Sequence, residues 1–259
     1  MSALTARIAG IGFWSDGLPD WTAARAYAMS GALPAEAPAR PAPALLAPNE
    51  RRRAPPSVLV ALEVALAACR DAGIAADTLP SVFTSTHGDL GITDYMCATL
   101  ATAPGELSPT KFNNSVHNAA AGYWTIGAGC MKTTTAISAH RASFAQGLVE
   151  AMTQLATDAQ AVLLVGYDTA ASGLLGTVTR SEGLLGAAVV LVREGRGPRL
   201  SARLADGEAE PGAGALALRA RANAMAPMLP LFDALAAGDA AVGLHAGPRR
   251  RLLLDIDHG

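Results

Sequence analysis

The residues with the clearest chemical potential lie around an expected junction between a strand and a helix. Lys132–Ser138 is a Thr- and Ile-rich run typical of a strand, and apolar residues recur at helical spacing from Ala142 onward. The elbow between them places side chains near a helix N-terminus, where the helix dipole and free N–H groups favour an anion or a thiolate. A nucleophile there would be Cys, Ser or Thr, but the sequence offers His140 and Arg141.

A second set of catalytic residue types occurs in "STHGD". His87 and Asp89 in this segment could form an acid–base pair. They also follow a β-rich run that starts at Ser81 and enters a glycine turn, and turn residues after a strand account for the same pattern. The sequence favours the turn over the acid–base pair.

Composition and charge limit the class of protein. The net charge of −2 and the pI near 6.2 give no reason to expect binding to nucleic acid. Cys69, Cys97 and Cys130 stand far apart, without the spacing of a disulfide framework or a zinc site. We therefore expect neither a metal nor another cofactor.

The chain carries no signal for a membrane or for export. The apolar stretch near the N-terminus is too short for a signal peptide and lacks a cleavage site of small residues. The longest apolar helix pattern, Val58–Cys69, contains Glu63 and is shorter than a membrane span. These features predict a cytoplasmic protein without a membrane span.

Strand patterns and helix patterns alternate along the chain, which predicts a layered α/β fold. Continuous apolar runs indicate buried strands, and Arg199–Asp206 alternates as a strand with one wetter face does. The expected buried strands are Ala6–Trp14, Ala161–Asp168 and Gly186–Glu194. Pro55, Pro56 and Gly73 bracket an expected helix, and the proline-rich stretch Leu33–Pro48 is an expected loop. A short helix over Pro230–Ala237 and a last strand over Arg249–Ile256 complete the pattern.

Four segments carry a resemblance to a known family. They are "RIAGIGFWS", "FNNSVHNAAAGYWTIGAG", "AVLLVGYD" and "SEGLLGAAVVLVRE". In this order and spacing the chain resembles the N-terminal half of β-ketoacyl-acyl-carrier-protein synthases over roughly Ala6–Asp206, with Asn118 and Gly122 at the family's Asn and Gly. The resemblance implies a thiolase-like α/β half-fold, with a mixed five-stranded sheet and a buried elbow helix over about Ala142–Thr157.

The same resemblance gives the expected domain organisation. Residues 1–259 form one β-ketoacyl synthase N-terminal-like domain, with a core over about 6–206. Residues 207–259 are then expected to be a short C-terminal extension.

The family's spacing identifies the position of the nucleophile. Its catalytic Cys lies twelve residues after the Gly that ends the interface helix, and counting from Gly129 gives Arg141. Counting back from Gly166 by the family's other spacing also gives Arg141. A local reading of "TAIS" would instead choose Ile137 but breaks both spacings, and Cys130 lies on the wrong side of the strand. A guanidinium remains protonated and cannot attack a thioester.

The histidine motifs of the family are also missing. The family's C-terminal half carries two histidines that stabilise the oxyanion and assist decarboxylation. Beyond the matched region this chain has only His245 and His258, outside any such motif. The resemblance therefore implies a chain that is not a condensing enzyme on its own.

A finer resemblance suggests what such a chain does. "ERRR" (Glu50–Arg53) and "SVHNAAAGYW" are similar to chain-length factors of aryl polyene and xanthomonadin-like pigment clusters. Such a subunit pairs with a catalytic ketosynthase and shapes the tunnel for the growing acyl chain, and an acyl carrier protein meets that complex. In thiolase-fold dimers the strand before the elbow, here Thr133–Ser138, pairs across the two-fold axis.

The resemblance also implies residues for the interface and for the pocket. They are Lys111, Phe112, His117, Asn118, Trp124, Thr134 and Thr135. Trp124 is expected to anchor the interface, since large aromatic side chains often do so. Ordinary packing and internal capping remain open as alternatives for these residues, and a cap or ion pair at the elbow remains open for Arg141.

Two other functions remain open at this stage. One is a minimal acyltransferase or β-ketoacyl synthase with an unrecognised nucleophile. The other is a structural protein that has lost its partner. Uptake of acyl groups from a carrier protein by the chain alone would indicate the enzyme.

Overall fold

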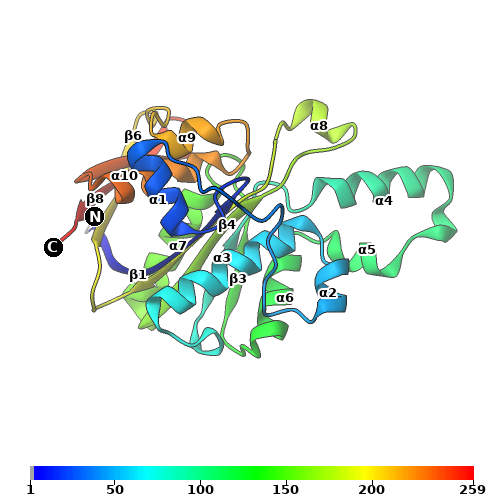
Figure 1. Cartoon of the computed structure of the whole chain (residues 1–259), viewed down its shortest axis with the longest axis horizontal. Coiled ribbons are helices and arrows are strands. Elements are labelled where there is room, and N and C mark those ends of the chain that lie inside the picture. The colour runs from blue at the N-terminus through cyan, green and yellow to red at the C-terminus, as the bar shows by residue number, and fades with distance from the viewer. Residues whose placement is uncertain (1–2) are drawn as a thin grey trace.

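The computed structural model describes residues 3–259, which build an eight-stranded mixed sheet (Figure 1). The strands are β1 (Leu4–Ser15), β2 (Ser81–Thr84), β3 (Thr134–Ile137), β4 (Ala161–Asp168), β5 (Leu185–Val192), β6 (Arg199–Asp206), β7 (Ala241–Gly247) and β8 (Arg250–Asp257). Their order across the sheet is β3-β2-β4-β5-β1-β6-β8-β7. β2 runs parallel to β3 and β4, and the other neighbouring pairs are antiparallel.

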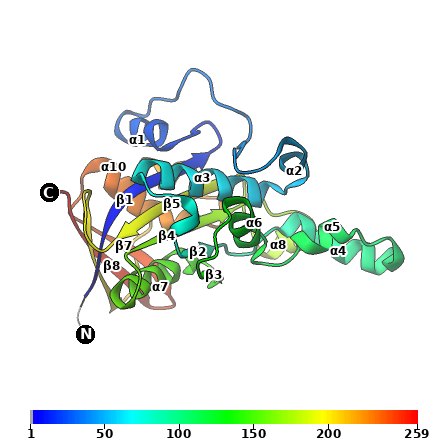
Figure 2. The same ribbon diagram turned by 90° about the horizontal axis from the view of Figure 1, so that it is seen from below.

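Helices cover both faces of this sheet. They are α1 (Trp21–Ser30), α2 (Pro48–Arg53), α3 (Pro56–Ala72), α4 (Leu90–Thr102), α5 (Pro109–Asn114), α6 (Ala119–Ala128), α7 (Ser143–Thr157), α8 (Leu175–Val178), α9 (Ala215–Arg219) and α10 (Leu229–Ala237). α3 and α6 belong to the apolar core on one face, and α7, α10 and α1 to the core on the other. Figure 2 shows α3 and α7 on opposite sides of the sheet.

The central strands are apolar throughout because both of their faces are covered. In β4, Val162 and Leu164 face the core under α7, whereas Leu163 and Val165 face the core under α3. β1 meets α3 closely at Gly12, where a Cβ atom would lie 1.9 Å from the Val64 carbonyl oxygen. A continuous apolar strand run thus predicted a two-sided core correctly.

The layered α/β fold and the elbow helix are confirmed, but the expected five-stranded sheet is wrong. The segment after Asp206, expected to be a short extension, forms the predicted last strand as β8 and the predicted short helix as α10, and it adds β7, which was not predicted. Phe232 of α10 is fully buried. The sequence of β7, Ala241–Gly247, contains two glycines and a histidine, so it lacks the β-branched pattern that marked the other strands.

α4 and α5 extend away from the sheet as an arm (Figures 1 and 2). Asp89 begins α4 as its N-cap, where its Oδ1 accepts a hydrogen bond of 3.0 Å from the Ile92 N–H. Only Leu90 and Ile92 of α4 are buried, so most of this helix lies outside the main core. In residues 3–259, no helix has both the length and the apolar character needed to cross a membrane.

Candidate functional site

The chain turns sharply between β3 and α7, as the sequence predicts. His140 has a φ of 53°, the left-handed conformation that a residue with a side chain adopts rarely. The buried Ser143 hydroxyl braces this turn, since it accepts from the Ala139 N–H at 2.9 Å and donates to the His140 carbonyl oxygen at 2.6 Å. The elbow is therefore a fixed turn that orients residues 140 and 141.

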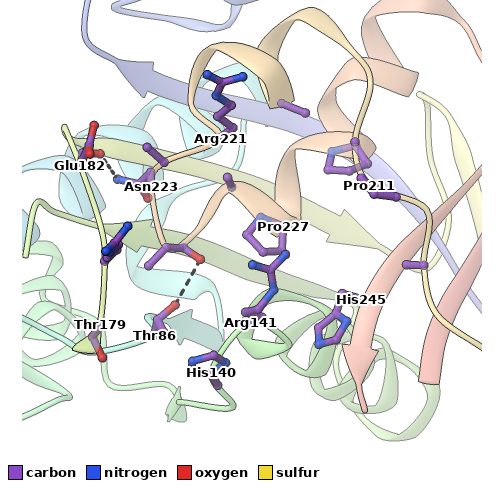
Figure 3. Close-up of a pocket in the computed structure, with 18 of the residues that line it drawn as sticks. Thr86, His140, Arg141, Thr179, Glu182, Pro211, Arg221, Asn223, Pro227 and His245 are labelled. Carbon is purple, nitrogen blue, oxygen red and sulfur yellow. Dashed lines mark hydrogen bonds between the residues drawn. The ribbon is translucent and has the colours of Figure 1, made fainter. Parts of the chain in front are cut away.

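Arg141 occupies the elbow, and no thiol lies beside it in the described chain. Its side chain is exposed and points from the elbow into a cavity (Figure 3). Ile137, the other reading of the nucleophile position, is the last residue of β3 and packs partly against the core. An alkyl side chain and a guanidinium are equally unable to form an acyl thioester.

The cysteines lie away from this turn. Cys130 precedes β3, whereas the elbow follows it, and its buried Sγ donates to the Leu79 carbonyl oxygen at 3.4 Å. Burial, and the nearby Cys130, raise the pKa of Cys69 to about 12. Cys97 lies exposed on α4. These positions agree with the sequence-based inference that Cys130 is not the nucleophile.

A cavity of about 830 Å³ opens at the elbow. It lies where the parallel strands β2, β3 and β4 end, the usual position of ligand sites in open α/β sheets. Segments far apart in the sequence form its walls, and Figure 3 shows Thr86, Arg141, Asn223 and His245 around it. No sequence pattern predicts this cavity, because no single segment contains it.

Four histidines gather near the elbow. The rings of His87 and His140 lie edge to face with their centroids 6.3 Å apart, and His117 Nε2 lies 2.9 Å from the Ser85 carbonyl oxygen. Burial, then the charges of His140 and His117, lower the pKa of His87. Burial, then the charge of Arg141, likewise lower the pKa of His245. Both shifts favour the neutral imidazole, and His245 is a residue that sequence reasoning noted without assigning it to the site.

Asp168 is a buried carboxylate that the sequence analysis missed. It ends β4 and is 1% exposed. Its Oδ1 accepts from the Ser85 hydroxyl at 2.6 Å, and its Oδ2 accepts from the Thr86 N–H at 3.0 Å. Burial raises its pKa to about 6, although these hydrogen bonds lower it. Asp168 thus fixes the turn after β2 that forms one wall of the cavity, and a carboxylate directly after a buried strand was the signal for it.

His87 and Asp89 do not form the acid–base pair that their types allowed. Both carboxylate oxygens of Asp89 are engaged elsewhere: Oδ1 caps α4, and Oδ2 accepts from the Ser57 hydroxyl at 2.8 Å. His87 instead lines the cavity. The structure supports the turn interpretation for Asp89.

The residues expected at the pocket and the interface are spread over three elements. Lys111 and Phe112 lie on α5, where the Lys111 ammonium sits 4.6 Å from the centre of the Tyr95 ring and Phe112 is exposed. His117 precedes α6, and Asn118 is its N-cap residue without a side-chain capping bond. These four residues remain accessible to a second molecule, but nothing in the chain itself assigns them a partner.

Thr134 and Thr135 lie on β3, an edge strand of the sheet. β3 pairs with β2 only, and its other edge is unpaired within the described chain. Thr134 accepts a hydrogen bond of 2.9 Å from the Ser81 hydroxyl. The predicted strand before the elbow is therefore present, with an edge that another strand can reach.

Trp124 is not an interface residue, contrary to the expectation. Its side chain is completely buried within this chain and packs against Phe83, with the ring centres 6.2 Å apart. A partner cannot contact it without unfolding this part of the core. The sequence analysis placed the wrong face of α6 outward, since Ile126 on the same helix is 84% exposed. An aromatic residue on a helix is as often a core residue as an anchor.

The comparisons with known proteins identify the family. The model described as beta-ketoacyl synthase, N-terminal domain, matches residues 21–251. This match covers most of the chain, so the chain belongs to the β-ketoacyl synthase N-terminal domain family, as the resemblance implied. The search of curated proteins found no match.

Solved structures share the fold at low identity. A chain from the structure of a ketosynthase (ApeO) in complex with its chain length factor (ApeC) from Xenorhabdus doucetiae is similar with a TM-score of 0.76 and 22% identity, covering 97% of this chain and 99% of that one. The ishigamide ketosynthase/chain length factor gives 0.72 at 16% identity, covering 98% and 99%. A chain of AntDE:AntF, a type II polyketide synthase acyl-carrier protein in complex with its ketosynthase, gives 0.73 at 12% identity, with both chains fully covered.

Proposed function

We propose that this chain is a chain-length-factor subunit, without a nucleophile of its own, that pairs with a catalytic ketosynthase in aryl-polyene-type chain elongation. The observation that carries this proposal is the elbow, which keeps the turn of a nucleophile position but presents Arg141. A guanidinium cannot form the acyl thioester on which condensation depends. The chain therefore needs a second subunit to supply the thiol.

The open edge of β3 supports pairing with such a subunit. Thr133 and Ile137 use their carbonyl oxygens to bind β2, through Ser81 and Ser85 respectively. In a parallel ladder, alternate residues face alternate neighbours, so the backbone of Ala136 faces away from β2. A partner strand that binds this edge would extend the sheet across the two subunits, with an interface of roughly 1,000 Å² or more.

Apolar side chains beside this edge support the same arrangement. Ile126 is 84% exposed and Met131 is 96% exposed, and both lie in the segment that leads from α6 into β3. Val116 and Phe112, on the preceding segment of the chain, are exposed as well. Exposed apolar side chains next to an open strand edge favour association.

Co-expression with a candidate ketosynthase, followed by purification through a tag on this chain, tests the proposal. The wild-type chain should retain the ketosynthase through size-exclusion chromatography. Ala136→Pro, which removes an outward N–H while leaving the β2 ladder intact, should release it, and Ala136→Val should retain it. Retention by Ala136→Pro at the wild-type level would contradict pairing through β3.

A second measurement separates this proposal from the alternative of a minimal acyltransferase. The purified chain alone is incubated with a radiolabelled acyl carrier protein, and label on the chain is followed after denaturation. We expect no label on this chain and label on the ketosynthase of the complex. Stable acyl label on this chain would establish the enzyme instead.

A further inference from the structure

The elbow cavity is lined by three arginines and by three glutamates, Glu182, Glu208 and Glu210. Arg141, Arg180 and Arg221 line it, and none of the three forms an ion pair or side-chain hydrogen bond with another of the residues 3–259. Of the three glutamates, Glu208 accepts from the Arg249 N–H at 2.8 Å and lies 3.9 Å from His245. Among the described residues, neither Glu182 nor Glu210 forms an ion pair with these arginines. A guanidinium in a concave site without a carboxylate beside it is available to a ligand.

Arg141 is the best placed of these groups. It follows the left-handed turn at His140 and lies two residues before the start of α7, a helix of fifteen residues. The positive end of the helix dipole and the guanidinium therefore act on the same volume. His245 lines the same cavity, and burial and the charge of Arg141 lower its pKa, which favours the neutral imidazole as a hydrogen-bonding group.

The cavity also offers apolar wall and sufficient size. Val178, Ala226, Pro227 and Pro230 line it together with the charged groups. Its volume of about 830 Å³ falls in the range of sites for small organic ligands. The site is thus suited to a molecule with one anionic group and an apolar or uncharged body.

We propose that this cavity binds an organic anion whose carboxylate or phosphate is held by Arg141, so that the former nucleophile position has become an anion-binding site. This goes beyond the pairing role, which needs no ligand in this chain. Arg141 is a binding residue in this proposal and takes part in no bond-making step.

Titration calorimetry on the full chain at low ionic strength tests the proposal. Two organic probes distinguish the possible sources of the anion: octanoate represents a carboxylated acyl chain, and pantetheine 4′-phosphate represents the phosphate of a carrier-protein arm. Inorganic phosphate tests the anion alone. Saturable binding of either organic probe supports the site, and the tighter probe identifies the source.

Variants connect the binding to the cavity. Arg141→Gln should weaken binding of the preferred probe by about tenfold or more, or about 1.4 kcal/mol. Arg53→Gln, at an exposed arginine on α2 outside the cavity, should leave it unchanged. Circular dichroism should show both variants folded, because both side chains are exposed. Three outcomes would overturn the proposal: no saturable binding to the wild-type chain, equal binding by Arg141→Gln, or equal weakening by Arg53→Gln. Because the chain is measured alone, the result is independent of whether a ketosynthase binds it.

Discussion

The two ends of the sheet differ in how they present an unpaired strand edge. At the open end, β3 is a four-residue strand beside the exposed side chains of Ile126 and Met131. At the opposite end, which we call the closed end because its edge is protected, the β7–β8 hairpin carries a bulge between His245 and Gly247 and an exposed Arg250. Bulges and charges protect an edge from pairing with another chain, whereas apolar edges favour it. Only the closed end is built to stay unpaired.

Exposed apolar side chains follow the same division. Of the twelve large apolar residues exposed in residues 3–259, eight lie between Leu100 and Val178, in the part of the chain that runs from α4 to α8. In Figure 1, α4, α5 and α8 lie on the right of the molecule, and β8 lies on the left. The uneven distribution indicates one preferred face for association rather than nonspecific association over the whole surface.

The largest expected effect sharpens this comparison within α6 itself. Trp124→Ala should lower the free energy of unfolding by about 3–5 kcal/mol, because it empties a fully buried site against Phe83. Ile126→Ala, on the exposed side of the same helix, should change it by less than about 0.5 kcal/mol. Urea unfolding of the isolated chain measures both. Similar losses in the two variants would mean that α6 does not divide into a core face and a free face.

The second prediction concerns the pH dependence of stability that arises from Asp168. Asp168, on the open side, has a pKa raised to about 6 from 3.8 by burial, so the folded chain holds a proton that the unfolded chain has lost between those values. This contribution to stability is present at low pH and is lost as the pH rises towards about 6. It amounts to roughly 3 kcal/mol at about 1.4 kcal/mol per pKa unit.

Comparison with Asp168→Asn isolates that contribution from the other carboxylates. The difference in unfolding free energy between the variant and the wild type should move in favour of the variant from pH 4 to pH 7. Urea unfolding at a series of pH values measures it. A difference that stays constant with pH would show that Asp168 titrates normally.

The third prediction sets the two ends against each other directly. Ile126→Glu should weaken the complex with the ketosynthase by about 2 kcal/mol, or roughly thirtyfold in Kd, since it places a charge in an apolar interface. Leu204→Glu on β6 and Leu218→Glu on α9 introduce the same charge at exposed leucines towards the closed end. Surface plasmon resonance should show no change for these two. Loss of binding in the leucine variants alone would move the interface to the closed end.

The smallest effect is expected at the ion pair between Asp206 and Arg250, which lies at the closed end. The two charged groups are 3.3 Å apart, but both side chains are mostly exposed. Arg250→Ala should therefore change the unfolding free energy by no more than about 0.5 kcal/mol, because exposed pairs contribute little. Thermal unfolding in low and high salt checks this, and a change beyond about 1 kcal/mol would show that the pair holds the hairpin in place.

The sequence predicted the elements that depend on local pattern. Ala161–Asp168 has the bounds that its apolar run indicated, and Arg199–Asp206 has those that its alternating pattern indicated. α3 ends before Gly73, which adopts the left-handed conformation that stops a helix. The elbow was placed correctly because strand and helix periodicities meet there. β7 was not predicted, because its two glycines and its histidine are not typical of a strand. Pairing with the neighbouring strand stabilises it.

The site depended on information that no local pattern holds. The cavity is lined by segments around residues 86, 141, 180, 221 and 245, which come together only in the folded chain. Trp124 was assigned to the wrong side of α6 because an apolar helix does not declare which face is buried when both faces are apolar. The position of Arg141 was predictable because spacing along the chain fixes it, whereas the surroundings of Arg141 were not.

The left-handed turn at His140 has a consequence for how this chain could change. A residue with a side chain in this conformation lowers stability by about 1–2 kcal/mol relative to a relaxed backbone, a cost that glycine would avoid. The backbone of the elbow therefore positions the residue at 141 beside the cavity, whatever its side chain. The turn is held by the hydrogen bonds of the Ser143 hydroxyl and not by Arg141. Replacing the Arg141 side chain would therefore change the chemistry at this position while the backbone of the elbow stays the same.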